Sequence, residues 1–139
     1  MRILCAVLLL GAALAGYCVT EHFPKFSSGA GFGALYGGVG INVEEHFDPR
    51  LSAAFGSNPF STHFYWTAAG LYHPDADNPL RFSVGLSNAL TFFNDAGDRG
   101  TRAFFGVGWA PTREDDYRGW NIDIIIGEGQ RTASLGYAF

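Results

Sequence analysis

A period-two alternation of side-chain character, repeated in short segments, constrains this chain more than any other feature. It is clearest in residues 80–87, where Leu80 and three further large apolar residues alternate with small or polar ones. Successive side chains of a β-strand point to opposite faces, whereas a helix repeats about every 3.6 residues. The pattern therefore predicts strands with one apolar face and one small or polar face.

Seven segments show this alternation, and residues typical of turns separate them. The segments are residues 35–47, 51–56, 62–73, 80–87, 102–110, 120–127 and 132–139. The connections are short enough for neighbouring strands to pair antiparallel. An eighth strand could come from residues 23–32 or from division of a longer segment. We therefore predict an all-β, antiparallel up-and-down meander of six to eight strands that closes into a small barrel, with eight strands expected.

Composition excludes several other classes of protein. Gly contributes 19 of the 139 residues and charged residues only 16%, against roughly 25% in an average soluble domain. The glycines disfavour a helical bundle, and the abundant aromatic residues disfavour disorder. Lys25 is the only lysine and the formal net charge is −4, so the basic surface of a nucleic-acid-binding protein is missing.

The N-terminus has the pattern of a secretory signal peptide. Arg2 precedes a twelve-residue apolar run, residues 3–14, which is short against the ~20 residues of a membrane-spanning helix. Small residues at Ala13 and Ala15 predict a signal peptide at residues 1–15, with cleavage as late as residue 20. Residues 16–28 then form an extension and residues 29–139 a single barrel domain. Lipidation of Cys18 is a minor alternative, because Tyr17 separates it from the small residues.

The residues on the small or polar faces of the predicted strands help to decide between two kinds of barrel. These faces consist mainly of Gly, Ser, Thr, Asn and Ala, whereas most charged residues lie in the turns. This favours an outer-membrane barrel, whose apolar faces meet lipid, with aromatic residues collected at the two interfaces. The alternative is a soluble periplasmic barrel or sandwich that binds an apolar ligand in its interior. The candidate interfacial residues lie near strand ends: Trp66, Trp109, Trp120, Tyr137 and Phe139.

Two segments add a resemblance. The last strand, Ala-Ser-Leu-Gly-Tyr-Ala-Phe at residues 133–139, resembles the C-terminal signature of bacterial outer-membrane β-barrel proteins. Residues 33–44 are similar to the Gly-rich first strand of small barrels of the OmpA/OmpX type. The resemblance implies a location in the outer membrane, contact with its lipids, and recognition of the strand ending at Phe139 by the barrel-assembly machinery. From the sequence as a whole we expect a structural or loop-mediated role and no catalysis.

The ionisable residues on the polar faces are the candidate interior cluster. They are Glu44, His46, Arg81, Arg102 and Asp123. Burial of these groups alone would be costly, so we expect them to pair across the interior. The four histidines have no metal-binding spacing, so we expect neither a metal nor another cofactor, and we expect His73 to be solvated in a loop.

A hydrolase is the remaining alternative. Ser87-Asn88 is similar to the Ser-Asn pair of small outer-membrane lipid A deacylases. Their catalytic histidine is expected just before it, where this chain has Gly85 and Leu86. This alternative predicts a histidine within hydrogen-bond reach of Ser83, Ser87 or Ser134.

Overall fold

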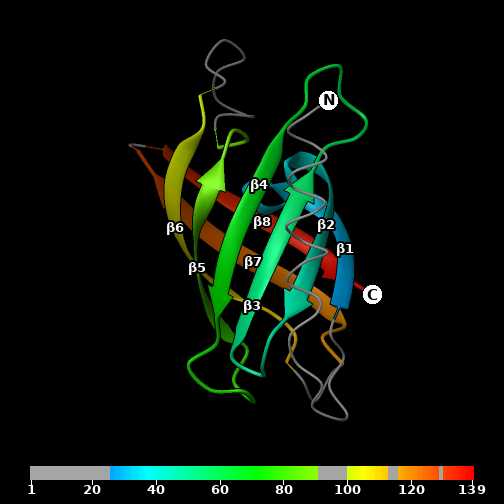
Figure 1. Ribbon diagram of the computed structural model, residues 1–139, viewed down its shortest axis with the longest axis vertical. Coiled ribbons are helices and arrows are strands. Elements are labelled where there is room, and N and C mark those ends of the chain that lie inside the picture. Colours follow the sequence, from blue (N-terminus) through cyan, green and yellow to red (C-terminus); the bar gives the residue numbers. More distant parts are fainter. Residues whose placement is uncertain (1–25, 91–99, 113–115, 129) are drawn as a thin grey trace.

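The chain folds into a closed eight-stranded barrel in which every strand pairs antiparallel with its neighbours (Figure 1). The computed structural model describes residues 26–90, 100–112, 116–128 and 130–139. The all-β meander expected from the alternation is therefore confirmed. The strands are β1 Phe26–Gly33, β2 Gly38–His46, β3 Leu51–Ser57, β4 Trp66–Tyr72, β5 Leu80–Ser87, β6 Arg102–Trp109, β7 Gly119–Gly127 and β8 Gln130–Ala138.

Closure depends on the pairing of β1 with β8. Phe32 lies opposite Leu135 and Gly29 opposite Ala138, so no sheet edge is left open. β1 is the eighth strand, for which residues 23–32 were one of the two possible sources, and it begins at Phe26, inside the range expected for the extension. The predicted signal peptide, residues 1–15, lies outside the described residues. None of the described residues belongs to a helix long and apolar enough to cross a membrane.

One predicted strand begins later than the alternation indicated. Residues 34–36 form a 3₁₀ turn, η1 Ala34–Tyr36, and β2 starts only at Gly38. Gly33, Gly37 and Gly38 all have positive φ, which the glycine backbone permits and which turns the chain inward. The Gly-rich segment of residues 33–44 thus contains the end of β1, this turn and most of β2, and it is not the first strand. Residues 62–65 likewise belong to the connection before β4.

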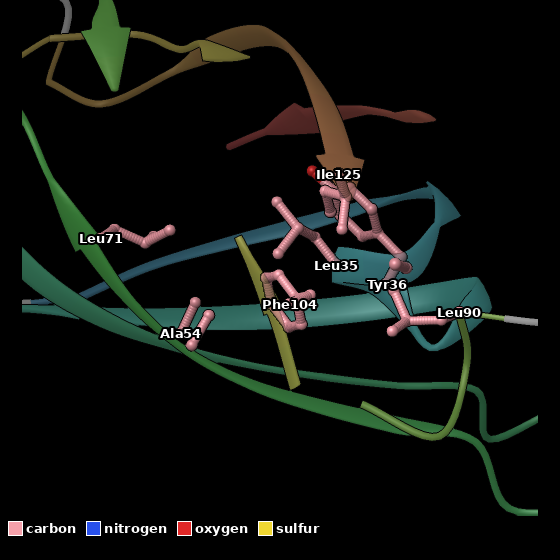
Figure 2. Close-up of a cluster of buried hydrophobic side chains, with 9 residues drawn as sticks. Leu35, Tyr36, Ala54, Leu71, Leu90, Phe104 and Ile125 are labelled. Atoms are coloured by element: carbon pink, nitrogen blue, oxygen red, sulfur yellow. The ribbon is translucent and has the colours of Figure 1, made fainter. Parts of the chain in front are cut away.

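The turn η1 fills one half of the barrel interior (Figure 2). Leu35 and Tyr36 are fully buried among side chains from several strands. The apolar cluster consists of Ala34, Leu35, Tyr36, Ala54, Ala69, Leu71, Leu90, Phe104 and Ile125. We call the turn η1, residues 34–36, the plug. Polar contacts also hold the plug in place, since the Leu35 N–H donates to Ser134 Oγ at 3.1 Å and Thr67 donates to the Ala34 carbonyl.

Inward-facing glycines make room for this plug. A Cβ on Gly136 or Gly31 would overlap the Tyr36 ring, and one on Gly56 would overlap the Leu35 carbonyl. A narrow barrel cannot hold both a plug and full-sized wall residues. Much of the glycine content on the polar faces is explained by this close approach.

The barrel has two rims. Of the described residues, the C-terminal rim carries 47–50, 73–79, 110–112, 116–118 and Phe139. The distal rim carries η1 and residues 58–65, 88–90, 100–101 and 128. The connections 47–50 and 73–79 are drawn at the bottom of Figure 1.

Candidate functional site

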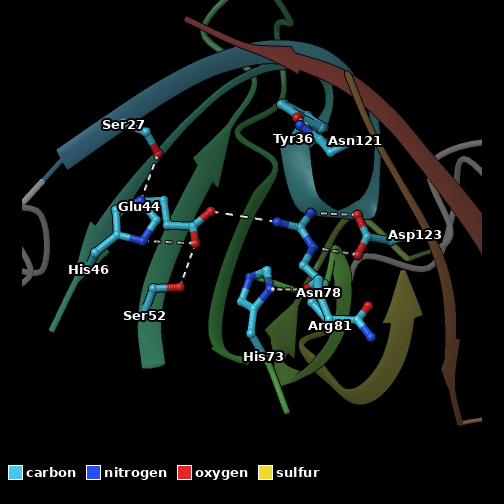
Figure 3. Close-up of polar contacts among 10 residues, drawn as sticks. All are labelled: Ser27, Tyr36, Glu44, His46, Ser52, His73, Asn78, Arg81, Asn121 and Asp123. Atoms are coloured by element: carbon cyan, nitrogen blue, oxygen red, sulfur yellow. Dashed lines mark hydrogen bonds and ion pairs between the residues drawn. The ribbon is translucent and has the colours of Figure 1, made fainter. Parts of the chain in front are cut away.

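The half of the interior nearer the C-terminal rim holds a buried ion-pair cluster (Figure 3). Its centre is Arg81 on β5, which reaches past Gly108 of the intervening strand β6 to Asp123 on β7. Nε donates to Oδ1 at 2.9 Å and a terminal nitrogen donates to Oδ2 at 2.6 Å, a two-pronged geometry that matches guanidinium to carboxylate. Asp123 is fully buried, so this pair depends on its partners rather than on water.

Glu44 on β2 extends the cluster to the opposite wall. Its Oε2 lies 3.6 Å from a nitrogen of Arg81, and its Oε1 accepts a hydrogen bond from Ser52. His46 Nδ1 lies 3.7 Å from the same Oε1, and His46 Nε2 is 3.1 Å from Ser27 Oγ. Asp123 thus accepts two hydrogen bonds from Arg81, and Glu44 has three polar partners, which is the condition under which buried charge is tolerated.

Two tyrosines contact residues of this half of the interior, one from the plug and one from the C-terminal rim. Tyr36 donates its hydroxyl proton to Asn121 Oδ1 at 2.7 Å and so connects the apolar plug to the polar half. Tyr117 stacks on the His46 ring at the C-terminal rim, with ring centroids 3.8 Å apart. A cavity lined by Glu44, Arg81 and their neighbours has room for about one water molecule. The interior is therefore packed around the cluster.

The structure brings together four of the five predicted interior residues, namely Glu44, His46, Arg81 and Asp123. Arg102 is not among them, because it lies on β6 at the distal rim, partly exposed, where a guanidinium nitrogen is 3.9 Å from Glu128 Oε2.

Sequence reasoning missed other members of the cluster. They are Ser27, Tyr36, Ser52, Tyr117 and Asn121. Asn121 and Ser52 lie on faces that the alternation marks as polar, whereas nothing in the local pattern marks Tyr36 or Tyr117.

The expectation for His73 is wrong. Its side chain lies just past the end of β4, is buried, and faces the cluster (Figure 3). The His73 N–H donates to the Arg50 carbonyl at 2.7 Å, which extends the β3–β4 pairing by one step and keeps the inward alternation. Burial lowers the pKa of His73 below its ordinary value.

None of the serines named by the hydrolase alternative is paired with a histidine in the described part of the chain. Ser87 Oγ lies 2.6 Å from Thr67 Oγ1 and donates to the Trp66 carbonyl at 3.1 Å. Ser134 Oγ accepts from the Leu35 N–H, and Ser83 Oγ is buried without a hydrogen-bond partner. Across residues 26–90, 100–112, 116–128 and 130–139, none of these three hydroxyls has the histidine that the alternative requires.

The outer surface of the strands is apolar. Val84 is 65% exposed and Ile124 59% exposed, whereas the inward Ser83 is 2% exposed. We call the outward large residues of the strands the outer belt: Phe32, Val39, Ile41, Val43, Phe55, Val84, Leu86, Phe105, Ile122, Ile124 and Ile126. In the described strands, the charged side chains at outward positions are Glu45 and Arg131, each next to a strand end.

Aromatic side chains border this belt at both rims. Trp66 lies at the distal rim, at the start of β4. Trp109, Trp120, Tyr137 and Phe139 lie at the C-terminal rim, exposed at the strand ends. Trp120 and Tyr137 make an edge-to-face contact with centroids 5.4 Å apart. The five predicted aromatic residues thus divide between the two ends of the belt.

The described residues contain no group of three or more His, Cys, Asp or Glu side chains placed to hold a metal ion. Comparisons of this chain with protein-family models, with curated proteins and with solved structures found no match.

Proposed function

We propose that this chain is an exported β-barrel protein of the bacterial outer membrane, with a structural role that includes presentation of its loops. The observation that carries the proposal is the sidedness of the barrel. The large apolar side chains of the outer belt face outward, whereas the interior holds the apolar cluster around η1 and the paired charged side chains. This is the arrangement of a barrel whose outside is solvated by lipid.

The physical reason is the size of the exposed apolar surface. Soluble monomers rarely expose continuous apolar patches of more than a few hundred Å². The outer belt runs around the barrel, from Ile41 on β2 through Val84 on β5 to Ile124 on β7. The soluble alternative requires the reverse sidedness, with these residues inside, and an interior apolar cavity for its ligand.

The filled interior favours a structural role over transport. The plug η1 occupies the distal half, and the cluster around Arg81 occupies the other. A pore would need a continuous water-filled path, and barrels of eight strands are just wide enough for side chains to fill. The proposal therefore assigns the exposed connections, and not the interior, to contacts with other molecules.

Assembly through the last strand is part of the proposal. β8 presents Leu135 and Tyr137 outward, and the N–H of Phe139, the residue after β8, donates to the Ser28 carbonyl at 2.9 Å. An exposed terminal aromatic on an outward face is accessible to an assembly factor before closure.

Membrane fractionation combined with a heat-modifiability gel tests the proposal. The full chain, expressed with its N-terminus intact in a Gram-negative host, should remain with the membranes after a high-salt wash. It should migrate differently in unheated and boiled samples, because a folded barrel resists detergent. Recovery in the periplasmic fraction without detergent would refute the proposal.

A further inference from the structure

The connection 58–65 at the distal rim differs chemically from the other exposed connections. It contains no Asp, Glu, Lys or Arg, whereas each of the connections 47–50, 73–79, 88–101, 110–118 and 128–129 contains an acidic residue. In their place it presents Phe60, which is 83% exposed, and Phe64, which is 55% exposed. Two large aromatic side chains exposed on one loop that lacks these charged residues indicate a contact surface.

Local hydrogen bonds hold this loop in shape. The Asn58 N–H donates to the Tyr65 carbonyl at 3.1 Å, and the Phe60 N–H donates to Asn58 Oδ1 at 2.9 Å. At the far end, the Trp66 N–H donates to Asn88 Oδ1 at 2.7 Å. The aromatic side chains are therefore exposed on an ordered turn, which projects beyond the end of β3 (Figure 1).

The loop joins the two shortest strands. β3 and β4 have 7 residues each, while β7 and β8 have 9 each. At about 3.3 Å per residue and a tilt of about 40°, these lengths give heights of about 18 Å and about 23 Å. The apolar band of an outer-membrane barrel is ~25 Å tall. No strand reaches this height by itself, and the β3–β4 side falls short by the most, about 7 Å.

We infer that the aromatic loop, residues 58–65, inserts into the lipid of the adjoining leaflet and completes the apolar band above β3 and β4. Its continuity with the outer belt supports lipid as the occupant, since Phe55 and Trp66 lie on the same side of the barrel, directly below the loop. Aromatic rings are favoured at the boundary between headgroups and acyl chains. This inference rests on the proposed function and specifies how the barrel is seated.

Spin-label accessibility in vesicles tests the inference. The full chain carries Cys5→Ser and Cys18→Ser, and a nitroxide is attached in turn through Thr62→Cys, Val84→Cys or Ala76→Cys. Thr62 is an exposed loop residue whose replacement leaves both phenylalanines in place. In phosphatidylcholine–phosphatidylglycerol vesicles, collision rates with oxygen and with a nickel chelate report lipid and water, respectively. The oxygen-to-nickel ratio at residue 62 should exceed that at residue 76 severalfold and remain below that at residue 84.

A matched variant tests whether the ratio at residue 62 depends on the two phenylalanines or only on the position of the loop. Adding Phe60→Ser and Phe64→Ser to the Thr62→Cys chain should lower the ratio to the value at residue 76, with the ratio at residue 84 unchanged. The inference would be overturned if, in the unsubstituted loop, the oxygen-to-nickel ratio at residue 62 were as low as that at residue 76 while the ratio at residue 84 stayed high. The proposed function would then still stand. Low collision rates with both reagents at residue 62 would overturn it in favour of a protein contact. An aqueous ratio at residue 84 would overturn the proposed function itself.

Discussion

Replacement of Arg81 by methionine should destabilise the barrel because it leaves two carboxylates buried without their main cation. Asp123 is fully buried and loses both hydrogen bonds from the guanidinium, at 2.9 and 2.6 Å. Glu44 loses a nitrogen at 3.6 Å but keeps Ser52 and His46. Removal of one partner from a buried pair typically costs about 3–5 kcal/mol. We expect a loss in the free energy of unfolding in this range.

Two further variants distinguish this effect from a general effect of losing an arginine. Arg102→Met breaks the half-exposed contact with Glu128, which is 3.9 Å long, and should cost no more than about 1 kcal/mol. Asp123→Asn combined with Arg81→Met removes the stranded charge. The double variant should therefore be more stable than the sum of the single losses predicts, by about 2 kcal/mol.

Equilibrium urea unfolding in detergent micelles, followed by tryptophan fluorescence, measures these differences. Reversibility is checked by refolding from urea for each variant. A loss below about 1 kcal/mol for Arg81→Met, equal to that of Arg102→Met, would refute the view that the cluster stabilises the interior through buried charge pairing.

Three other perturbations have defined outcomes. Gly56→Ala should cost about 1–3 kcal/mol in urea unfolding, because its Cβ would overlap the Leu35 carbonyl. Gly70→Ala should be neutral, because its Cβ would lie 3.9 Å from the Val84 carbonyl oxygen, and equal losses for the two variants would contradict the packing around η1. Because burial lowers the pKa of His73, the unfolded state binds more protons than the folded state as the pH falls below about 6.5, so the free energy of unfolding should decrease there. His73→Gln should make this decrease smaller, and an unchanged pH profile would contradict the burial of His73. Deletion of Phe139 should reduce membrane assembly in cells, measured by heat-modifiability, while refolding in detergent is retained; normal assembly would argue against recognition of the last strand.

The alternation predicted the faces of the strands well because strand periodicity is local. Ser83 and Val84 are adjacent in sequence, and the structure places one inside and the other on the outer belt. The eight-stranded closure was also predictable, since short connections leave few other topologies. The same reasoning placed Glu44, Arg81 and Asp123 on interior faces, where they meet.

Height along the barrel and the path of the connections were not predictable in this way. Arg81 and Arg102 both lie on inward faces, but their strands run in opposite directions and place them at opposite rims. The plug was missed because alternation continues through Leu35 as it would in a strand, while the inward turn depends on positive φ at three glycines. Tyr117 reaches His46 from a charged connection, a tertiary contact with no local signal.

An arginine on the outer belt tests the central claim most directly. Val84 lies at the middle of β5 and is 65% exposed, so Val84→Arg should leave the interior unchanged and place a charge on the outer surface of the barrel. In a bilayer an arginine near the midplane costs about 2–4 kcal/mol, whereas in water it would cost little. Reversible urea unfolding from phospholipid vesicles should therefore show a loss of about 2–4 kcal/mol. An unchanged free energy of unfolding, with the chain folded, would contradict a lipid-facing outer belt.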